Sequence, residues 1–139
     1  MILLDTMVVS ELMRPVADAR IERWVNLQPY ASIWVSSVTI FEIRFALHTM
    51  PPGKRQAATA AGFERWLTEV VQGRVAGFDE TAAERAAELA AARRQVGRPG
   101  NLRDTMIAGI VLANHATLAT RNVKHFEDIA KFVVNPWGK

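Results

Sequence analysis

Residues 1–12, MILLDTMVVSEL, place an apolar run, a carboxylate and a helical segment in immediate succession. Met1 to Leu4 has the length and apolar character of a buried strand, and Asp5 ends it. From Thr6 onward the apolar residues recur at helical spacing. The stretch therefore predicts a strand that leads through an acidic residue directly into a helix.

The same order recurs further along the chain. Residues Ser32 to Val38, SIWVSSV, are β-branched and aromatic, which predicts a second strand. Residues Thr39 to Met50 continue as a helix that Pro51, Pro52 and Gly53 end. Parallel strands need crossover connections, and helices between strands supply them. The sequence therefore predicts an α/β fold with a central, mostly parallel sheet flanked by helices.

The remaining elements follow the same alternation, and nothing between them resembles a linker, an internal repeat or a low-complexity segment. Thr81 and Glu84 have the spacing of a capping box at the start of an alanine-rich helix. We expect one domain over residues 1–139. The expected elements are a helix over 54–72, a strand over 74–78, a helix over 79–96, a loop over 97–100, a helix over 104–115, and strands over 117–120 and 131–135.

The composition is that of a globular protein with a mild basic surplus. Half of the residues are apolar, the formal net charge is +3, and the sequence pI is near 9.8. Such a surplus favours polyanionic partners without identifying one. The chain has no cysteine, which excludes a disulfide framework and a thiolate metal site and fits a reducing cytoplasm. The N-terminal residues lack a basic region and reach Asp5 early, so we expect neither a secretory signal nor a membrane span.

Four arginines and no acid lie between positions 93 and 103, and the next residue is Asp104. One interpretation is a solvated helix end, because cations suit the C-terminus of a helix dipole. The other is an approach to the site at Asp104 in which arginines contact the phosphates of a nucleic acid. Of the four, we expect Arg98 and Arg103 to bind RNA.

Oxygen side chains follow the predicted strands. Asp5 ends the first strand, Glu42 lies in the first turn of the helix after the second, and Asn122 follows the strand TLAT. Asp104 opens the helix that precedes TLAT. Ligands of open α/β sheets bind beyond the carboxyl ends of the strands, where three of these four residues lie. Asp104 joins them if its helix points its N-terminus to the same edge, and the four side chains would then converge.

These residues lie in motifs that resemble a known family. LLDT at Asp5, FEIRFAL around Glu42, RDTMIAG at Asp104, and LATRNVKHF followed by VVNPW resemble the PIN-domain toxins of type II toxin-antitoxin operons, of the VapC and FitB-like kind. The similarity runs from Met1 to about Trp137 and is weakest in the middle of the chain. It implies a PIN-like three-layer sandwich in which the three acids form a metal cluster.

The resemblance also assigns neighbours to the three acids. Asn122 occupies a fourth position that is often acidic in the family, and here it is neutral. Thr6 matches the hydroxyl often found beside the first acid, and Thr120 is expected to lie next to the site. Met7 is a departure, because many members have asparagine there.

The function that the resemblance implies is a magnesium-dependent endoribonuclease, the toxin component of a toxin-antitoxin module. Hydrolysis of a phosphodiester concentrates negative charge on the attacking water, the phosphoryl oxygens and the leaving oxygen, so a divalent cation is a natural stabiliser. Mg²⁺ takes oxygen ligands and keeps several waters, so a few carboxylates suffice, and Mn²⁺ is a possible substitute. The implied partners are RNA, a second copy of the chain, and a small DNA-binding antitoxin that blocks the site.

Each candidate also has a structural interpretation. Asp5 and Asp104 are favoured at helix N-termini in any protein, and Glu42 lies three residues after Thr39, which is capping-box spacing. Thr120 and Asn122 could be turn residues. The histidines are interpreted as surface or helix-end residues, and the tryptophans as core or interface. The functional alternative is a catalytically weakened PIN-fold protein that acts by binding, which the neutral Asn122 and Met7 motivate.

Overall fold

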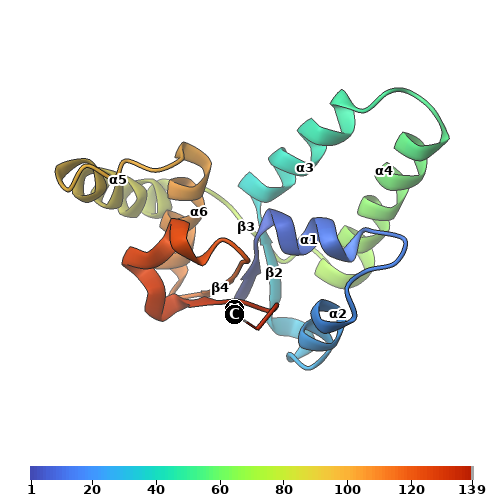
Figure 1. Cartoon of the computed structure of the whole chain (residues 1–139), viewed down its shortest axis with the longest axis horizontal. Coiled ribbons are helices and arrows are strands. Elements are labelled where there is room, and N and C mark those ends of the chain that lie inside the picture. Colours follow the sequence, from blue (N-terminus) through green and yellow to red (C-terminus); the bar gives the residue numbers. More distant parts are fainter. Residues whose placement is uncertain (139) are drawn as a thin grey trace.

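The structure, a computed structural model, describes residues 1–138 and contains a parallel sheet (Figure 1). In this part of the chain the sheet has five strands in the order β3-β2-β1-β4-β5, and each neighbouring pair is parallel. The prediction of a mostly parallel sheet is confirmed. The strands are β1 (Ile2–Leu4), β2 (Ile33–Ser36), β3 (Val75–Ala76), β4 (Thr117–Ala119) and β5 (Val133–Val134).

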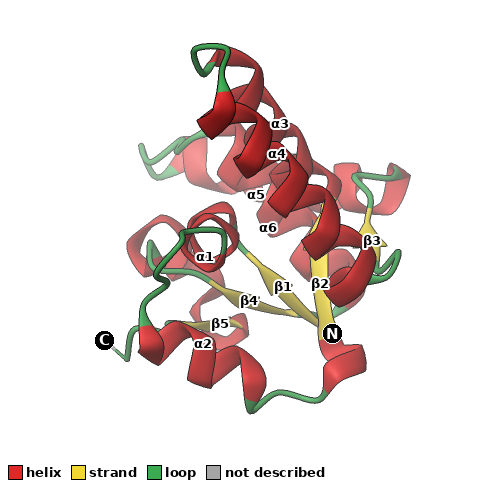
Figure 2. Cartoon of the chain, turned by 90° about the vertical axis from the view of Figure 1, so that its right-hand side faces the viewer, coloured by secondary structure: helices red, strands yellow, loops and turns green. Residues whose placement is uncertain are grey.

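Helices cover both faces of this sheet (Figures 1 and 2). They are α1 (Thr6–Leu12), α2 (Ala19–Asn26), α3 (Ser37–Thr49), α4 (Lys54–Trp66), α5 (Glu80–Gln95) and α6 (Leu102–Asn114). Shorter helical turns span Tyr30–Ser32, Leu67–Val71 and Val123–Phe132. None of these helices is long and apolar enough to cross a lipid bilayer, as far as residues 1–138 show.

Two hydrophobic cores lie on opposite faces of the sheet. Leu3 and Leu118 pack with α5, α6 and the 123–132 turn, whereas Leu4 and Ala119 pack with α1, α2, α3 and α4. Successive side chains of a strand point to opposite faces, so neighbouring residues of one strand enter different cores. The result is a three-layer α/β/α sandwich, as expected.

One glycine sets how closely α6 packs on α5. A Cβ atom at Gly109 would lie 2.5 Å from the carbonyl oxygen of Ala82 and 2.7 Å from the Cβ of Ala86. Such contacts are shorter than van der Waals contact, so only glycine allows this approach. The close packing fixes the axis of α6, and with it the first turn that carries Asp104.

Several element boundaries differ from the sequence-based expectation because other side chains cap the helices. The Ser36 hydroxyl accepts the backbone N–H of Thr39 at 3.0 Å, so α3 begins earlier and Glu42 lies in its second turn. Asn101 caps α6, which therefore begins at Leu102. Asp79, not Thr81, caps α5. The expected helix over 54–72 ends as α4 at residue 66 and continues as a separate turn, and α2 and the 123–132 turn were not expected.

Candidate active site

Asp5 lies at the end of β1, where its carboxylate is almost fully buried. The Asp5 side chain is the N-cap of α1, and its Oδ1 accepts the backbone N–H of Thr6 at 2.9 Å. Its Oδ2 accepts the hydroxyl of Thr120, which follows β4, at 2.6 Å. The backbone N–H of Asp5 donates to Ala119 at 2.9 Å. The Asp5 carboxylate therefore caps α1 and accepts a hydrogen bond at each of its two oxygens.

Burial raises the pKa of the Asp5 carboxyl above its ordinary value, since the charged form loses hydration. The hydrogen bonds from Thr120 and Thr6 act in the opposite direction, because they stabilise the carboxylate. The negative charges of Asp104 and Glu42 raise the pKa further. Asp104 and Glu42 therefore each lie close enough to Asp5 to disfavour its negative charge, and such a perturbed carboxyl marks a candidate functional site.

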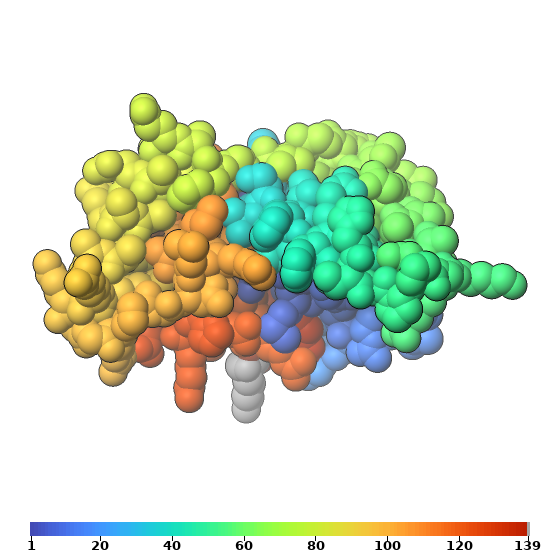
Figure 3. All heavy atoms as spheres, turned by 90° about the horizontal axis from the view of Figure 1, so that it is seen from above, coloured from blue at the N-terminus to red at the C-terminus, as the bar shows by residue number. Residues whose placement is uncertain are grey.

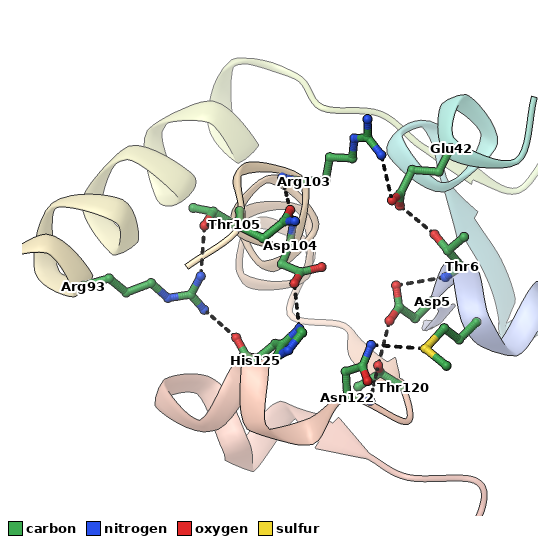
Figure 4. Close-up of polar contacts among 12 residues, drawn as sticks. Asp5, Thr6, Glu42, Arg93, Arg103, Asp104, Thr105, Thr120, Asn122 and His125 are labelled. Atoms are coloured by element: carbon green, nitrogen blue, oxygen red, sulfur yellow. Dashed lines mark hydrogen bonds and ion pairs between the residues drawn. The ribbon is translucent and has the colours of Figure 1, made fainter. Parts of the chain in front are cut away.

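Glu42 comes from α3 and faces Asp5 across Thr6 (Figure 4). The Thr6 hydroxyl donates to Glu42 Oε1 at 2.7 Å, while the backbone N–H of Thr6 donates to Asp5. Glu42 Oε2 lies 3.6 Å from a terminal nitrogen of Arg103. Thr6 is thus the direct link between two of the predicted site acids. The capping-box interpretation of Thr39 and Glu42 is wrong, because Ser36 is the N-cap.

Asp104 lies in the first turn of α6 and contacts a histidine. Asp104 Oδ2 is 2.9 Å from Nδ1 of His125, which belongs to the 123–132 turn. His125 is exposed, as expected of a surface residue, and it also contacts Asp104. Asp104 also receives the cap of its helix through its backbone, since Asn101 Oδ1 accepts the Asp104 N–H at 3.2 Å.

Asn122 lies beside the acids, next to the residue that departs from the family pattern. Its backbone N–H donates to the Thr120 hydroxyl oxygen at 3.1 Å. Its side-chain amide nitrogen is 3.1 Å from the sulfur of Met7. The structure therefore brings Asn122 and Thr120 to the same edge of the sheet as Asp5, as the sequence predicted.

The donor set at this edge suits a hard cation. It consists of carboxylate, hydroxyl and amide oxygens, with one imidazole, and the described part of the chain has no cysteine. Within residues 1–138, however, no three His, Cys, Asp or Glu side chains lie close enough together to hold a metal ion by themselves. A cation that keeps several waters, as Mg²⁺ does, fits this spacing better than one that needs a closed protein cage.

The four arginines near position 100 have different surroundings. Arg93 is only 6% exposed and pairs with Asp128 through two hydrogen bonds of 2.7 and 2.9 Å, so both sequence-based interpretations are wrong for this residue. Arg98 is exposed and paired with Glu127. It lines an open hollow of about 890 Å³ that Lys124 also borders and that reaches Asp104.

Arg103 lies at the rim of the site between two helices. Its guanidinium carbon is 5.4 Å from the ring centre of Phe41 and 6.0 Å from that of Phe45, both on α3. The start of α6 reaches across to α3 in the view from above (Figure 3). Arg103 therefore contacts the site acid Glu42 and an exposed aromatic pair at the same time.

Comparison with known proteins shows the family of the chain. The model of the PIN domain family matches residues 2–132. The chain belongs to the PIN domain family. Its curated relatives cover almost the whole of this PIN domain.

Plasmid stability protein StbB of Pseudomonas syringae pv. tomato is 39% identical to this PIN-domain chain over 99% of both chains. VapC ribonuclease Y4jK of Sinorhizobium fredii is 34% identical over 99% of this chain and 98% of the relative. Toxin FitB of Neisseria gonorrhoeae is 29% identical over 99% of both. A chain in the crystal structure of FitAcB from the same organism matches with a TM-score of 0.89, covering 99% of each chain. The resemblance to PIN-domain toxins of the VapC and FitB-like kind is confirmed.

The PIN fold explains why the acids were predictable and two other residues were not. Asp5 follows a strand, and Glu42 and Asp104 lie in the first two turns of helices, and sequence patterns reveal all three elements. His125 contacts the site acid Asp104, and Arg93 contacts the carbonyl of His125, in both cases between segments distant in the sequence. The only local signal for Arg93 is its place in the last turn of α5, which favours a cation in any protein.

Proposed function

We propose that this PIN-domain protein is a magnesium-dependent endoribonuclease and the toxin component of a type II toxin-antitoxin module. The observation that carries the proposal is the meeting of Asp5, Glu42 and Asp104, from three separate elements, at the carboxyl edge of the sheet. Family membership supports it, because two relatives are named VapC ribonuclease and Toxin FitB.

The three acids share one task in this proposal, and their neighbours support it. When bound, Mg²⁺ would activate a water and stabilise the negative charge that develops on the phosphodiester, and Mn²⁺ could substitute for it. Asp5, Glu42 and Asp104 would hold the ion, directly or through its waters. Thr6 and Thr120 orient the first two carboxylates by donating hydrogen bonds to them. Asn122 would add an amide oxygen without charge, which holds a hard cation more weakly than an aspartate.

RNA would approach along the basic side chains that border the acids. Arg103 reaches from α6 over Glu42, and Arg98 and Lys124 border the hollow beside Asp104. Guanidinium groups suit phosphates because their donors match the phosphate oxygens. An RNA strand that crosses the site would therefore have cationic contacts on both sides of the acids.

The proposal includes the partners that the family implies. A small DNA-binding antitoxin would cover the acidic site, and two copies of the chain would form a homodimer in the cytoplasm. The relatives support an antitoxin because StbB is named a plasmid stability protein and FitB a toxin.

A second candidate is a PIN-fold protein with weakened chemistry that acts by binding. Asn122 favours it, because the side-chain amide at this position contacts the Met7 sulfur and brings no charge to the site. This candidate predicts antitoxin binding without appreciable RNA cleavage.

The deciding experiment measures cleavage of structured RNA by the purified protein in Mg²⁺ and in chelator. We expect cleavage only with Mg²⁺ and none from Asp104→Asn, which replaces the carboxylate with a neutral amide of the same shape. Thr59→Ala, a change at a half-buried position on α4 away from the acids, serves as the control for preparation and folding. Equal cleavage with and without metal would refute the metal mechanism, and no cleavage by the wild type would favour the binding candidate.

A further inference from the structure

His125 contacts Asp104 through one carboxylate oxygen and leaves the other toward the site. Its Nδ1 is 2.9 Å from Asp104 Oδ2. An ionised carboxylate only accepts hydrogen bonds, so the hydrogen of this contact belongs to the imidazole. Within residues 1–138, Asp104 Oδ1 accepts no hydrogen bond, and it points toward Asp5 (Figure 4).

Asp104 differs from the other two acids in what fixes it. The backbone N–H of Thr6 donates to Asp5 Oδ1, and the Thr120 hydroxyl donates to Asp5 Oδ2. The Thr6 hydroxyl donates to Glu42. Among the described residues, the only side chain that donates to the carboxylate of Asp104 is His125. Without this contact the Asp104 carboxylate would rotate freely about its terminal bond, because that torsion has broad minima.

Two hydrogen bonds hold the backbone of His125 in place. The buried guanidinium of Arg93 donates to the carbonyl oxygen of His125 at 3.2 Å and to the Thr105 hydroxyl at 2.9 Å. The same guanidinium forms the paired hydrogen bonds to Asp128 described above. The His125 N–H also donates to the carbonyl of Asn122 at 3.0 Å. Arg93 thus ties the 123–132 turn to α5 and α6, and the imidazole starts from a fixed backbone.

We infer that His125 is a positioning residue for Asp104, with Arg93 as the support that holds His125 in place. By donating from Nδ1 to Oδ2, His125 directs Oδ1 toward Asp5 and the cation site. The inference rests on the proposed function, since it concerns the orientation in which Asp104 would hold a cation. Outer partners that orient a ligand in this way commonly change metal affinity by about 10- to 100-fold when removed.

Two substitutions of one residue separate the hydrogen bond from the ring. His125→Phe keeps a planar ring and removes the donor. His125→Asn keeps an N–H group close to the place of Nδ1, because the asparagine amide follows the same bonds as the first half of the imidazole. His48→Phe, in the last turn of α3, is the matched control for loss of a histidine.

The measurement is calorimetric titration of each full-length protein with Mn²⁺ alone, together with RNA cleavage over a range of Mg²⁺ concentrations. We expect His125→Phe to weaken Mn²⁺ binding at least about 10-fold and to need correspondingly more Mg²⁺ for cleavage. His125→Asn should stay within about 3-fold of the wild type, and His48→Phe should match it. Thermal melts of all variants show whether the fold is retained, and His125→Asn keeps the test decisive if His125→Phe does not fold.

The inference is overturned if His125→Phe binds Mn²⁺ like the wild type while Asp104→Asn does not. It is also overturned if His125→Asn binds Mn²⁺ normally but fails to cleave RNA at saturating Mg²⁺, because the imidazole would then act on the substrate itself. If Asp104→Asn binds Mn²⁺ as the wild type does, the proposed metal site fails, and the role of His125 fails with it.

Discussion

At the level of single residues, the pKa values of Asp5 and Asp128 are shifted in opposite directions. Asp5 is 5% exposed and has a raised pKa, because burial and the neighbouring acids disfavour its charge. Asp128, in the 123–132 turn, has a lowered pKa, because the Arg93 guanidinium donates to its carboxylate. In the metal-free protein, the negative charge of Asp5 therefore disfavours the folded state, whereas the negative charge of Asp128 stabilises it.

We expect the melting temperature of Asp5→Asn minus that of the wild type to increase as the pH is raised from about 4 to about 7 in buffer that contains chelator. A group with a raised folded pKa contributes stability below its unfolded pKa, near 4, and loses it as the pH rises through the folded pKa. The wild type carries this loss, whereas the side-chain amide of the variant does not titrate. Thermal melts across this range test it, with Asp79→Asn, at the exposed start of α5, as the control. If the difference in melting temperature between Asp5→Asn and the wild type is constant with pH, burial does not disfavour the charged form of Asp5.

At the level of elements, α5, α6 and the 123–132 turn are joined by one buried guanidinium. Arg93 leaves the last turn of α5, contacts Thr105 in α6 and pairs with Asp128 in the turn. A buried arginine in a protein interior needs such pairing, because an uncompensated charge there is very unfavourable. Arg93 therefore links the three elements of the layer that carries Asp104.

Arg93→Met should lower the free energy of unfolding at pH 7 by about 2–3 kcal/mol, below the range for a fully buried pair because Asp128 is 37% exposed. The difference from the wild type should shrink as the pH falls below about 4, because the lowered pKa of Asp128 gives stability that is lost as this carboxylate is protonated. Arg85→Met removes an exposed pair with Glu88 on the same helix and should change stability by less than about 0.5 kcal/mol. Urea unfolding at both pH values is the measurement. Equal changes in the free energy of unfolding for the two substitutions would contradict this linking role of Arg93.

At the level of the whole molecule, the strand order explains why distant residues meet. β1 lies at the centre of the sheet between β2 and β4. Asp5 follows β1, the helix that carries Glu42 follows β2, and Thr120 follows β4, so parallel strands deliver these residues to one edge. α6 runs back to β4, which places its first turn, with Asp104, at that edge as well.

The basic side chains on this edge predict the salt dependence of RNA binding. Loss of one phosphate contact should reduce the slope of log affinity against log salt by about 0.7 for single-stranded RNA. We expect this for Arg103→Ala and a smaller reduction for Arg98→Ala, because Glu127 already pairs with Arg98. Binding titrations use the Asp104→Asn background, which we expect not to cleave RNA, and Arg55→Ala at the start of α4 is the control. Unchanged slopes for both site arginines would place the RNA elsewhere.

The sequence by itself determined the order of strand, carboxylate and helix, the α/β fold, and the set of residues at the sheet edge. These follow from local periodicity and from the rule that parallel strands end at a common edge, so Asp5, Glu42 and Asp104 could be named in advance. The tertiary structure alone decided that Arg93 turns inward to Asp128 and that His125 meets Asp104. Those contacts join residues 35 and 21 positions apart, and no local spacing encodes them. They depend on how closely α6 packs on α5 and on the path of the 123–132 turn, which only the complete packing of the chain fixes.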